Sequence, residues 1–216
     1  MNDGERQLQD RLGTRERADA FHSRQTLRHL NDTMRDFIGR QEMMFLATAD
    51  AAGDCDSTFR AGPPGFVRVL DEQHLSWPEY RGNGVMASLG NITENAHVGL
   101  LFIDFREAIG LHVNGRASIL ENDQLLARPD LPDSVLDGLL QDGGRRPERW
   151  VAVDVVEAYI HCSKHIPQMV KRSEVRQAWG TDDVVRKGGD YFKAKHSTRP
   201  WVDDVAAGAA VPGGAS

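Results

Sequence analysis

The sequence has few of the features that define several large protein classes. Only two of its 216 residues are cysteines, Cys55 and Cys162. No apolar run approaches the roughly 20 residues that a membrane-spanning helix needs. The N-terminal segment is charged and lacks the apolar stretch of a secretory signal. These absences predict a cytoplasmic protein that does not enter the membrane and whose two thiols stay reduced.

The sequence also lacks a basic excess, with 26 Lys and Arg against 32 Asp and Glu. The formal net charge is −6, whereas proteins that bind nucleic acids or anionic membrane surfaces usually carry a basic excess to offset phosphate charge. We therefore expect no nucleic-acid partner. The net charge still allows a local basic pocket for one small phosphate.

Several catalytic and cofactor motifs are missing. No G-x-G-x-x-G follows a predicted strand, and no G-x-S-x-G is present, so neither a Rossmann site nor a hydrolase triad is predicted. His161, Cys162 and His165 do not have the spacing of a known zinc motif, and strand alternation places His161 and Cys162 on opposite faces. We predict no metal site.

The elements that are present favour a mainly β (α+β) fold. Apolar residues at helical spacing predict two or three helices between Glu5 and Arg40, with a break at Gly13 and Thr14 as the next N-cap. Strands are predicted at residues 43–49, 57–60, 66–70, 74–78, 97–105, 109–120 and 150–162. Further helices are predicted at 84–89, 134–140 and 173–180. Six or so short strands separated by turns indicate an antiparallel barrel rather than a doubly wound sheet.

The chain divides into four predicted parts. Residues 1–40 form an N-terminal helical extension, and residues 41–165 form the barrel. Residues 166–205 are a C-terminal segment of helical or irregular structure. Residues 206–216 are low in complexity, and we expect them to be disordered.

The stretch from Phe59 to Asn91 concentrates glycine, charge and polar residues between short apolar runs. Arg68 is predicted to face the opposite side of its strand from Val67 and Val69. The segment from Arg81 to Gly84 lets the backbone approach a ligand, and a helix starting near Gly84 would direct free N–H groups at a phosphate.

Each of these features also has a plain structural interpretation. Taken singly, Arg68 is more often an exposed strand residue, the glycines serve a tight turn, and Trp77 belongs to the core. Ser88 and Asn91, three apart, share one helix face. Together the residues predict an anion site whose ligand they do not name.

The order of several segments resembles the pyridoxamine 5'-phosphate oxidase-like, FMN-binding split β-barrel family. The resemblance covers residues 43–162 and rests on five segments. They are M-M-F-L-A-T-A-D, F-V-R-V-L, W-P-E-Y-R-G-N-G-V-M-A-S-L-G-N-I, H-V-G-L-L-F-I-D-F and G-L-H-V-N-G-R-A. No single segment is specific, but their order is.

The resemblance implies a homodimer with the flavin in a cleft between two protomers. It implies that one group of residues lines the flavin ring and ribityl chain and that another approaches the phosphate. The first group is Val67, Arg68, Val69, Ser76 and Trp77, and the second is Arg81, Asn83, Ser88 and, less directly, Asn91. It places Arg60, in the preceding loop, on the substrate side.

The implied activity is that of an FMN-dependent oxidoreductase acting on a small organic substrate. Because the flavin carries the chemistry, the sequence assigns no catalytic side chain. Ser88-Leu89-Gly90 stands where the family usually has a lysine beside the phosphate. The alternatives are therefore a deazaflavin-dependent reductase, a non-catalytic flavin- or haem-binding protein with His112 or His161 as the axial ligand, and a structural dimer with an empty cleft. His161 or Lys164 is also a candidate to reach the substrate cleft.

Overall fold

The computed structural model describes residues 3–128, 131, 147–171, 183, 185 and 188–199. The chain forms two compact units, Met1–Glu174 and Val175–Ser216. In the second unit the described residues include one 3₁₀ helix, η2 (Ala194–His196). The helices predicted at 134–140 and 173–180 and the predicted tail at 206–216 lie outside the described residues.

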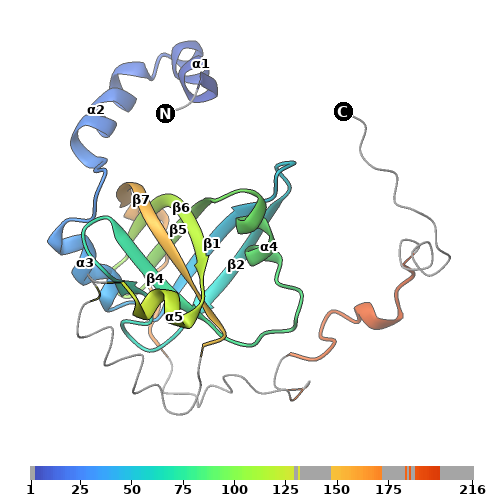
Figure 1. The fold of residues 1–216 in the computed structure, drawn as a ribbon. Helices are drawn as coiled ribbons and strands as arrows, with labels where there is room; N and C mark the ends of the chain where they lie inside the picture. Colours follow the sequence, from blue (N-terminus) through green and yellow to red (C-terminus); the bar gives the residue numbers. More distant parts are fainter. Residues whose placement is uncertain are drawn as a thin grey trace. The chain divides into compact units, whose positions relative to one another are not determined.

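Seven strands of the first unit form one antiparallel sheet in the order β2-β1-β5-β6-β7-β4-β3 (Figure 1). The strands are β1 (Met43–Ala49), β2 (Cys55–Ala61), β3 (Arg68–Val69), β4 (His74–Glu79), β5 (His97–Asp104), β6 (Ile109–Leu120) and β7 (Arg149–His161). A 3₁₀ turn, η1 (Ser163–His165), follows β7. The edge strands β2 and β3 are not paired with each other, so the barrel is split between them.

The strand predictions were largely correct. β1 and β6 have the predicted bounds, and β2, β4, β5 and β7 differ from theirs by a few residues. The exception is the strand predicted at 66–70, of which only Arg68–Val69 is extended. Phe66 N–H donates to the Pro63 carbonyl and Leu70 N–H to the His74 carbonyl, so turns occupy both ends of this segment.

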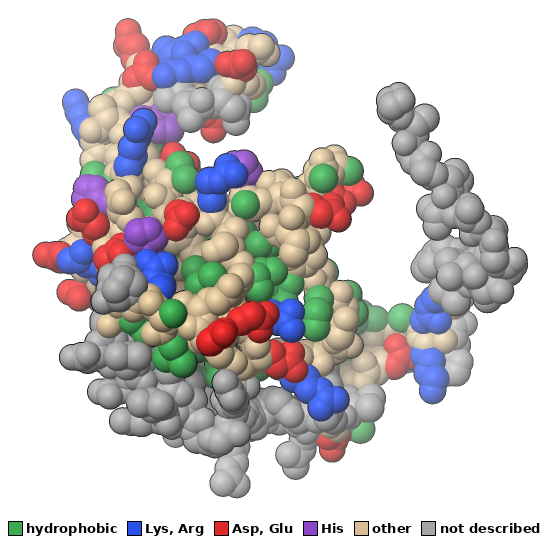
Figure 2. Space-filling model, in the orientation of Figure 1, with side chains coloured by type: hydrophobic (Ala, Val, Ile, Leu, Met, Phe, Trp, Pro, Cys, Tyr) green, Lys and Arg blue, Asp and Glu red, His purple; other side chains and the backbone are tan. Residues whose placement is uncertain are grey.

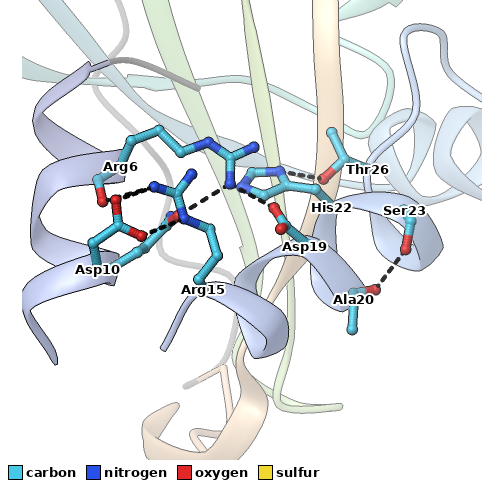
Figure 3. A network of polar contacts seen from close by, with 9 residues as sticks. Arg6, Asp10, Arg15, Asp19, Ala20, His22, Ser23 and Thr26 are labelled. Atoms are coloured by element: carbon cyan, nitrogen blue, oxygen red, sulfur yellow. Dashed lines mark hydrogen bonds and ion pairs between the residues drawn. The ribbon is translucent and has the colours of Figure 1, made fainter. Parts of the chain in front are cut away.

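The N-terminal region forms three helices, α1 (Asp3–Leu12), α2 (Arg15–Gln25) and α3 (Asp32–Gly39). Thr14 holds the N-cap position of α2 as predicted, but its side chain makes no capping hydrogen bond. Instead, ion pairs connect α1 to α2 and its N-terminus (Figure 3): Arg6 with Asp19 at 2.6 Å, and Arg15 with Asp10. Exposed pairs of this kind contribute little to stability, because water and salt screen them.

Helix α3 closes one end of the barrel. Asn31 is its N-cap, and the Asn31 Oδ1 accepts a hydrogen bond from Met34 N–H at 2.9 Å. This cap explains the break in the helical pattern near residue 31. Phe37 and Ile38 are buried and belong to the same core as the strands.

The helix after β4 begins later than predicted. We expected it at 84–89, and the structure shows α4 (Ala87–Glu94). Gly84 (φ 84°) and Met86 (φ 55°) are in the left-handed region, which a right-handed helix cannot include. The Arg81–Gly84 turn is therefore separated from the helix N-terminus. The short helix α5 (Asn122–Leu126), which begins with a capping box formed by Glu121 and Gln124, was not predicted.

The core fills the inside of the curved sheet. Its largest fully buried side chains include Trp77, Trp150, Phe102, Leu30, Ile38, Met44 and Leu46. Hydrophobic side chains also reach the surface, and Figure 2 shows a group of them in the middle of one face. Among the described helices, none has the length and apolar character needed to cross a membrane.

A β-bulge interrupts the pairing of β6 with β7 between Asn114 and Gly115. A Cβ atom added at Gly115 would lie 2.5 Å from the Asp154 carbonyl oxygen and 2.5 Å from Val153 Cγ1. We expect Gly115→Ala to lower the free energy of unfolding by about 1–3 kcal/mol in urea titrations, because the backbone at the bulge must shift.

The control for this substitution is Gly90→Ala. Gly90 lies in α4, and a Cβ atom added there would have no neighbour within 4 Å. Alanine stabilises helix interiors relative to glycine, so this variant should be as stable as the parent or more stable. An equal loss of stability in Gly115→Ala and Gly90→Ala would contradict the conclusion that the close contact with the neighbouring strand requires glycine at position 115.

Candidate functional site

The split between β2 and the β3–β4 hairpin has a polar lining. On β2 the half-buried, inward-facing side chains are Asp56, Thr58 and Arg60. Arg60 lies within this strand, not in a loop. Its Nε donates to Glu79 Oε1 of β4 at 2.8 Å, so a side-chain ion pair connects the two sides that backbone pairing leaves open.

Glu79 holds two donors at once. Its Oε1 accepts from Arg60 Nε at 2.8 Å and from Trp77 Nε1 at 2.8 Å. The Glu79 and Arg60 side chains are only 12% and 22% exposed, so this pair is more shielded from water than a typical surface salt bridge. The network fixes the end of β4 relative to β2.

Removal of the Glu79 carboxylate should therefore destabilise the barrel. We expect Glu79→Ala to lower the free energy of unfolding by about 1–3 kcal/mol, because Trp77 N–H and Arg60 both lose their acceptor. The matched control is Glu42→Ala, which breaks the exposed Glu42–Lys171 pair and should change stability by less than about 0.5 kcal/mol. If chemical denaturation shows similar losses in the free energy of unfolding for Glu79→Ala and Glu42→Ala, the Glu79 network does not stabilise the barrel more than an exposed ion pair does.

Arg68 carries the strongest local sign of a ligand. It lies on the edge strand β3 opposite Ser76 of β4. Its Nε is buried and has no hydrogen-bond partner, and no other buried side-chain nitrogen or oxygen among the described residues is in that state. A Cβ atom added at Gly65 would lie 3.8 Å from Arg68 Nη1, so the guanidinium lies beside the Gly62–Gly65 bend. A buried donor without an acceptor costs free energy, and an anionic ligand would supply the acceptor.

The predicted neighbours of Arg68 are mostly part of the core. Val67 is 1% exposed and Trp77 is fully buried, and Val69 packs against the core. Ser76 is also fully buried, and its Oγ donates to the Val151 carbonyl at 2.9 Å. These side chains position the hairpin. An edge strand has backbone N–H and C=O groups on one side that no neighbouring strand binds. A ligand can therefore form hydrogen bonds with the backbone of β3 as well as with the Arg68 side chain.

The loop between β4 and α4 holds the next predicted residues. Arg81 and Asn83 are exposed. The Asn83 Oδ1 accepts from Val85 N–H at 3.0 Å, which stabilises the turn locally. The backbone from Arg81 to Gly84 is exposed, which is consistent with the prediction that a ligand can approach it.

Ser88 and Asn91 lie on one face of α4, as predicted, and that face packs on the sheet. Ser88 Oγ donates to Asp56 Oδ2 at 3.0 Å, and Asn91 Nδ2 donates to Thr48 Oγ1 at 3.0 Å. Both side chains thus attach α4 to β2 and β1. Their contact with a cofactor remains a prediction.

The structure thus divides the predicted residues into three groups, of which Arg81 and Asn83 form the one in the loop between β4 and α4. Val67, Arg68, Val69, Ser76 and Trp77 belong to the β3–β4 hairpin, and Ser88 and Asn91 belong to α4. The Arg60–Glu79–Trp77 network was missed from the sequence. Glu79 follows a predicted strand, but no local signal pairs it with residue 60, because their contact depends on the curvature of the whole sheet.

A second polar cluster lies on the outer face of β6 and β7. His112 Nε2 is 2.8 Å from His161 Nδ1, and the His112 ring stacks on Tyr159 with 4.8 Å between centroids. Burial, reinforced by the neighbouring His161, lowers the pKa of His112. β7 ends at His161, and Cys162 beyond it is an exposed free thiol. Within the described ranges, no three histidine, cysteine or acidic side chains are grouped to hold a metal ion.

The outer face of β2, β1 and β5 contains an open hollow of about 630 Å³. Small side chains form its floor, and polar side chains of neighbouring strands border it; they include Ala47, Ser57, Gly99, Asn114 and Arg116. Next to it Phe45 and Phe59 pack edge to face, 5.6 Å between centroids, and are 36% and 50% exposed. Exposed apolar groups around a concave surface are typical of protein interfaces.

The chain thus forms a split antiparallel barrel with the buried, unpartnered Nε of Arg68 on the edge strand β3. The sequence profile described as pyridoxamine 5'-phosphate oxidase matches residues 30–162. The chain therefore belongs to the pyridoxamine 5'-phosphate oxidase family and has its FMN-binding type of fold. No curated protein matches the chain.

Solved structures with a similar fold come from several bacteria. A putative pyridoxamine 5'-phosphate oxidase from Lactobacillus delbrueckii is 22% identical, with 62% of this chain and 98% of that chain covered and a TM-score of 0.44. An FMN-binding protein from Syntrophomonas wolfei is 12% identical (59% and 83% covered, TM-score 0.43). HutZ, a haem storage protein from Vibrio cholerae, is 16% identical (58% and 89% covered, TM-score 0.37).

Proposed function

We propose that this protein is an FMN-dependent oxidoreductase that acts on a small organic molecule. The observation that carries the proposal is the buried, unpartnered Nε of Arg68 at the split of a barrel of this family. FMN has a phosphate and carbonyl oxygens that accept hydrogen bonds from such a donor. When bound, the flavin supplies the electron transfer to or from the substrate.

The chain's own residues bind and orient the cofactor in this proposal. Arg68 and the outer backbone of β3 contact the flavin, and Arg81 and the Asn83 turn approach its phosphate. The Arg60–Glu79 pair holds β2 beside the hairpin, so the two sides of the split keep a fixed separation. Ser88 and Asn91 keep α4 in place through the sheet.

The proposed active form is a homodimer that binds two flavins at the interface between its protomers. The support is the exposed Phe45–Phe59 pair beside the open hollow on β2, β1 and β5. A two-fold dimer uses the same surface on both copies. The exposed aromatic rings of one copy can then fill the hollow of the other, which removes apolar surface from water.

The test is a titration of the cofactor-free protein with FMN and with riboflavin, followed by flavin fluorescence. We expect FMN to bind at least about tenfold more tightly than riboflavin, because riboflavin lacks the phosphate that the basic residues contact. Equal affinities would show that no phosphate site exists. Absence of binding by either would overturn the proposal.

Haem binding is the second candidate, and the His112–His161 pair favours it. The contact between His112 Nε2 and His161 Nδ1 leaves His161 Nε2 and His112 Nδ1 outside it, and we take His161 Nε2 as the axial ligand of this candidate. Haemin added to the protein should then produce a Soret band that His161→Ala abolishes. A flavin-binding protein that shows no such band with haemin would exclude this candidate.

A further inference from the structure

Two imidazole rings meet on the outer face of β6 and β7, at a site that the proposed flavin function does not use. His112 pairs with Tyr159 and Gly110 pairs with His161 across the antiparallel strands, so the two histidines are diagonal neighbours. His112 Nε2 and His161 Nδ1 are 2.8 Å apart, and the rings are tilted by 52°. At this distance one ring nitrogen carries a proton and donates a hydrogen bond to the other.

The surroundings hold both rings in place. Tyr159 stacks on His112 at 4.8 Å, and Phe21 of α2 meets Tyr159 edge to face at 6.0 Å. A Cβ atom added at Gly110 would lie 2.7 Å from His161 Cβ, so glycine at this position makes room for His161. Tyr159 thus holds His112 in place, and the backbone at Gly110 lies close to His161. Packing positions both rings before a ligand arrives, as a preorganised binding site requires.

We propose that His112 and His161 form a two-histidine site for one divalent transition-metal ion, with Cu²⁺ preferred. Neutral imidazole nitrogen is a good ligand for such ions. The ion takes the lone pairs of His112 Nε2 and His161 Nδ1. The shared proton moves to the far nitrogen of its own ring, and water completes the coordination.

The separation of the two nitrogens favours a tetragonal ion over a tetrahedral one. With metal–nitrogen bonds of about 2.0–2.1 Å, two cis ligands at a right angle are about 2.9 Å apart and two tetrahedral ligands about 3.4 Å. The observed 2.8 Å is close to the first value. To meet at one ion in this arrangement, each lone pair must turn by about 45° from the line between the nitrogens, and rotation about the Cβ–Cγ bonds, whose energy wells are broad, provides this turn. Cu²⁺ and Ni²⁺ prefer tetragonal geometry, and Cu²⁺ binds nitrogen ligands most tightly.

The test is calorimetric titration of tag-free, chelator-treated protein with Cu²⁺, Ni²⁺ and Zn²⁺, with electron paramagnetic resonance of the Cu²⁺ form. We expect one Cu²⁺ per chain, bound more tightly than Ni²⁺ or Zn²⁺, with a resonance spectrum coupled to two imidazole nitrogens. His112→Gln and His161→Gln should each weaken binding by at least about tenfold. His74→Gln and His97→Gln, which alter histidines elsewhere on the sheet, are the matched controls and should bind as the parent does.

Two results would overturn the site. One is that no ion binds with a dissociation constant below about 100 µM. The other is that both glutamine variants bind Cu²⁺ as tightly as the parent protein does. Melting curves of all variants distinguish a lost ligand from a lost fold. The titration is independent of the flavin, since it is performed without FMN and reads metal occupancy alone. A protein that ignores FMN yet binds Cu²⁺ through this pair would contradict the proposed function and support this inference. Haemin bound by the pair with no Cu²⁺ bound would overturn the inference.

Discussion

Replacement of Arg68 by methionine is expected to weaken FMN binding by about 30-fold or more while the cofactor-free protein becomes more stable. Loss of a buried charged partner costs a ligand about 2–5 kcal/mol, and 1.4 kcal/mol is a factor of ten. The same substitution removes a buried donor that has no acceptor in the cofactor-free chain. We expect that removal to contribute about 1 kcal/mol to stability, or a rise of about 2–4 °C in Tm.

The opposite signs of these two effects distinguish a binding residue from a structural one. If Arg68 supports the fold, Arg68→Met should lower the Tm of the cofactor-free protein. If it has neither role, both quantities should stay at the parent values. Arg35→Met is the control, because Arg35 is a surface arginine of α3 paired with Asp32, and it should change neither FMN affinity nor stability measurably.

Replacement of Phe59 by glutamate is expected to convert the proposed homodimer into a monomer. Phe59 is 50% exposed and packs on Phe45. In the proposed dimer a carboxylate at this position would be buried without a partner in both copies, at a cost of several kcal/mol. The dimer dissociation constant should rise by about 100-fold or more, measured by light scattering over a concentration series. In the proposed dimer each flavin contacts both protomers, so the affinity for FMN should fall together with the dimer affinity.

The matched control for Phe59→Glu is Leu126→Glu. Leu126 is 49% exposed and lies on α5, away from the proposed interface. This variant should remain dimeric and bind FMN as the parent does. A parent protein that is monomeric at about 100 µM, or a Phe59→Glu variant that stays dimeric, would contradict the proposed interface.

The sequence predicted elements best where local patterns decide the structure. β6 has its predicted bounds because one face is buried and the other is not, so its apolar and polar residues alternate. β1 has its predicted bounds because a continuous apolar run ends at a turn after Ala49. The segment at 66–70 also alternates, but turns at Phe66 and Leu70 shorten the strand. The predicted start of α4 was wrong because left-handed residues at 84 and 86 delay it, and Met86 is a residue type that rarely adopts this conformation.

The candidate site was predictable only in part. Strand alternation and the family resemblance both selected Arg68, and the structure then showed its buried Nε without a partner. The sequence also placed Ser88 and Asn91 on one helix face, but not the direction of that face, which depends on the packing of α4 against β1 and β2. The Arg60–Glu79 and His112–His161 contacts join residues 19 and 49 positions apart. Such pairs follow from sheet curvature and strand register, which no local pattern encodes.

The absorption spectrum of the protein purified without added flavin, with mass spectrometry of what it releases on denaturation, tests the central claim most directly. The account predicts a yellow protein that releases FMN. It also predicts that protein stripped of the flavin gains about 2.7 kcal/mol of stability when FMN is added at 100 times its Kd. A colourless protein whose Tm does not change when FMN is added would contradict it.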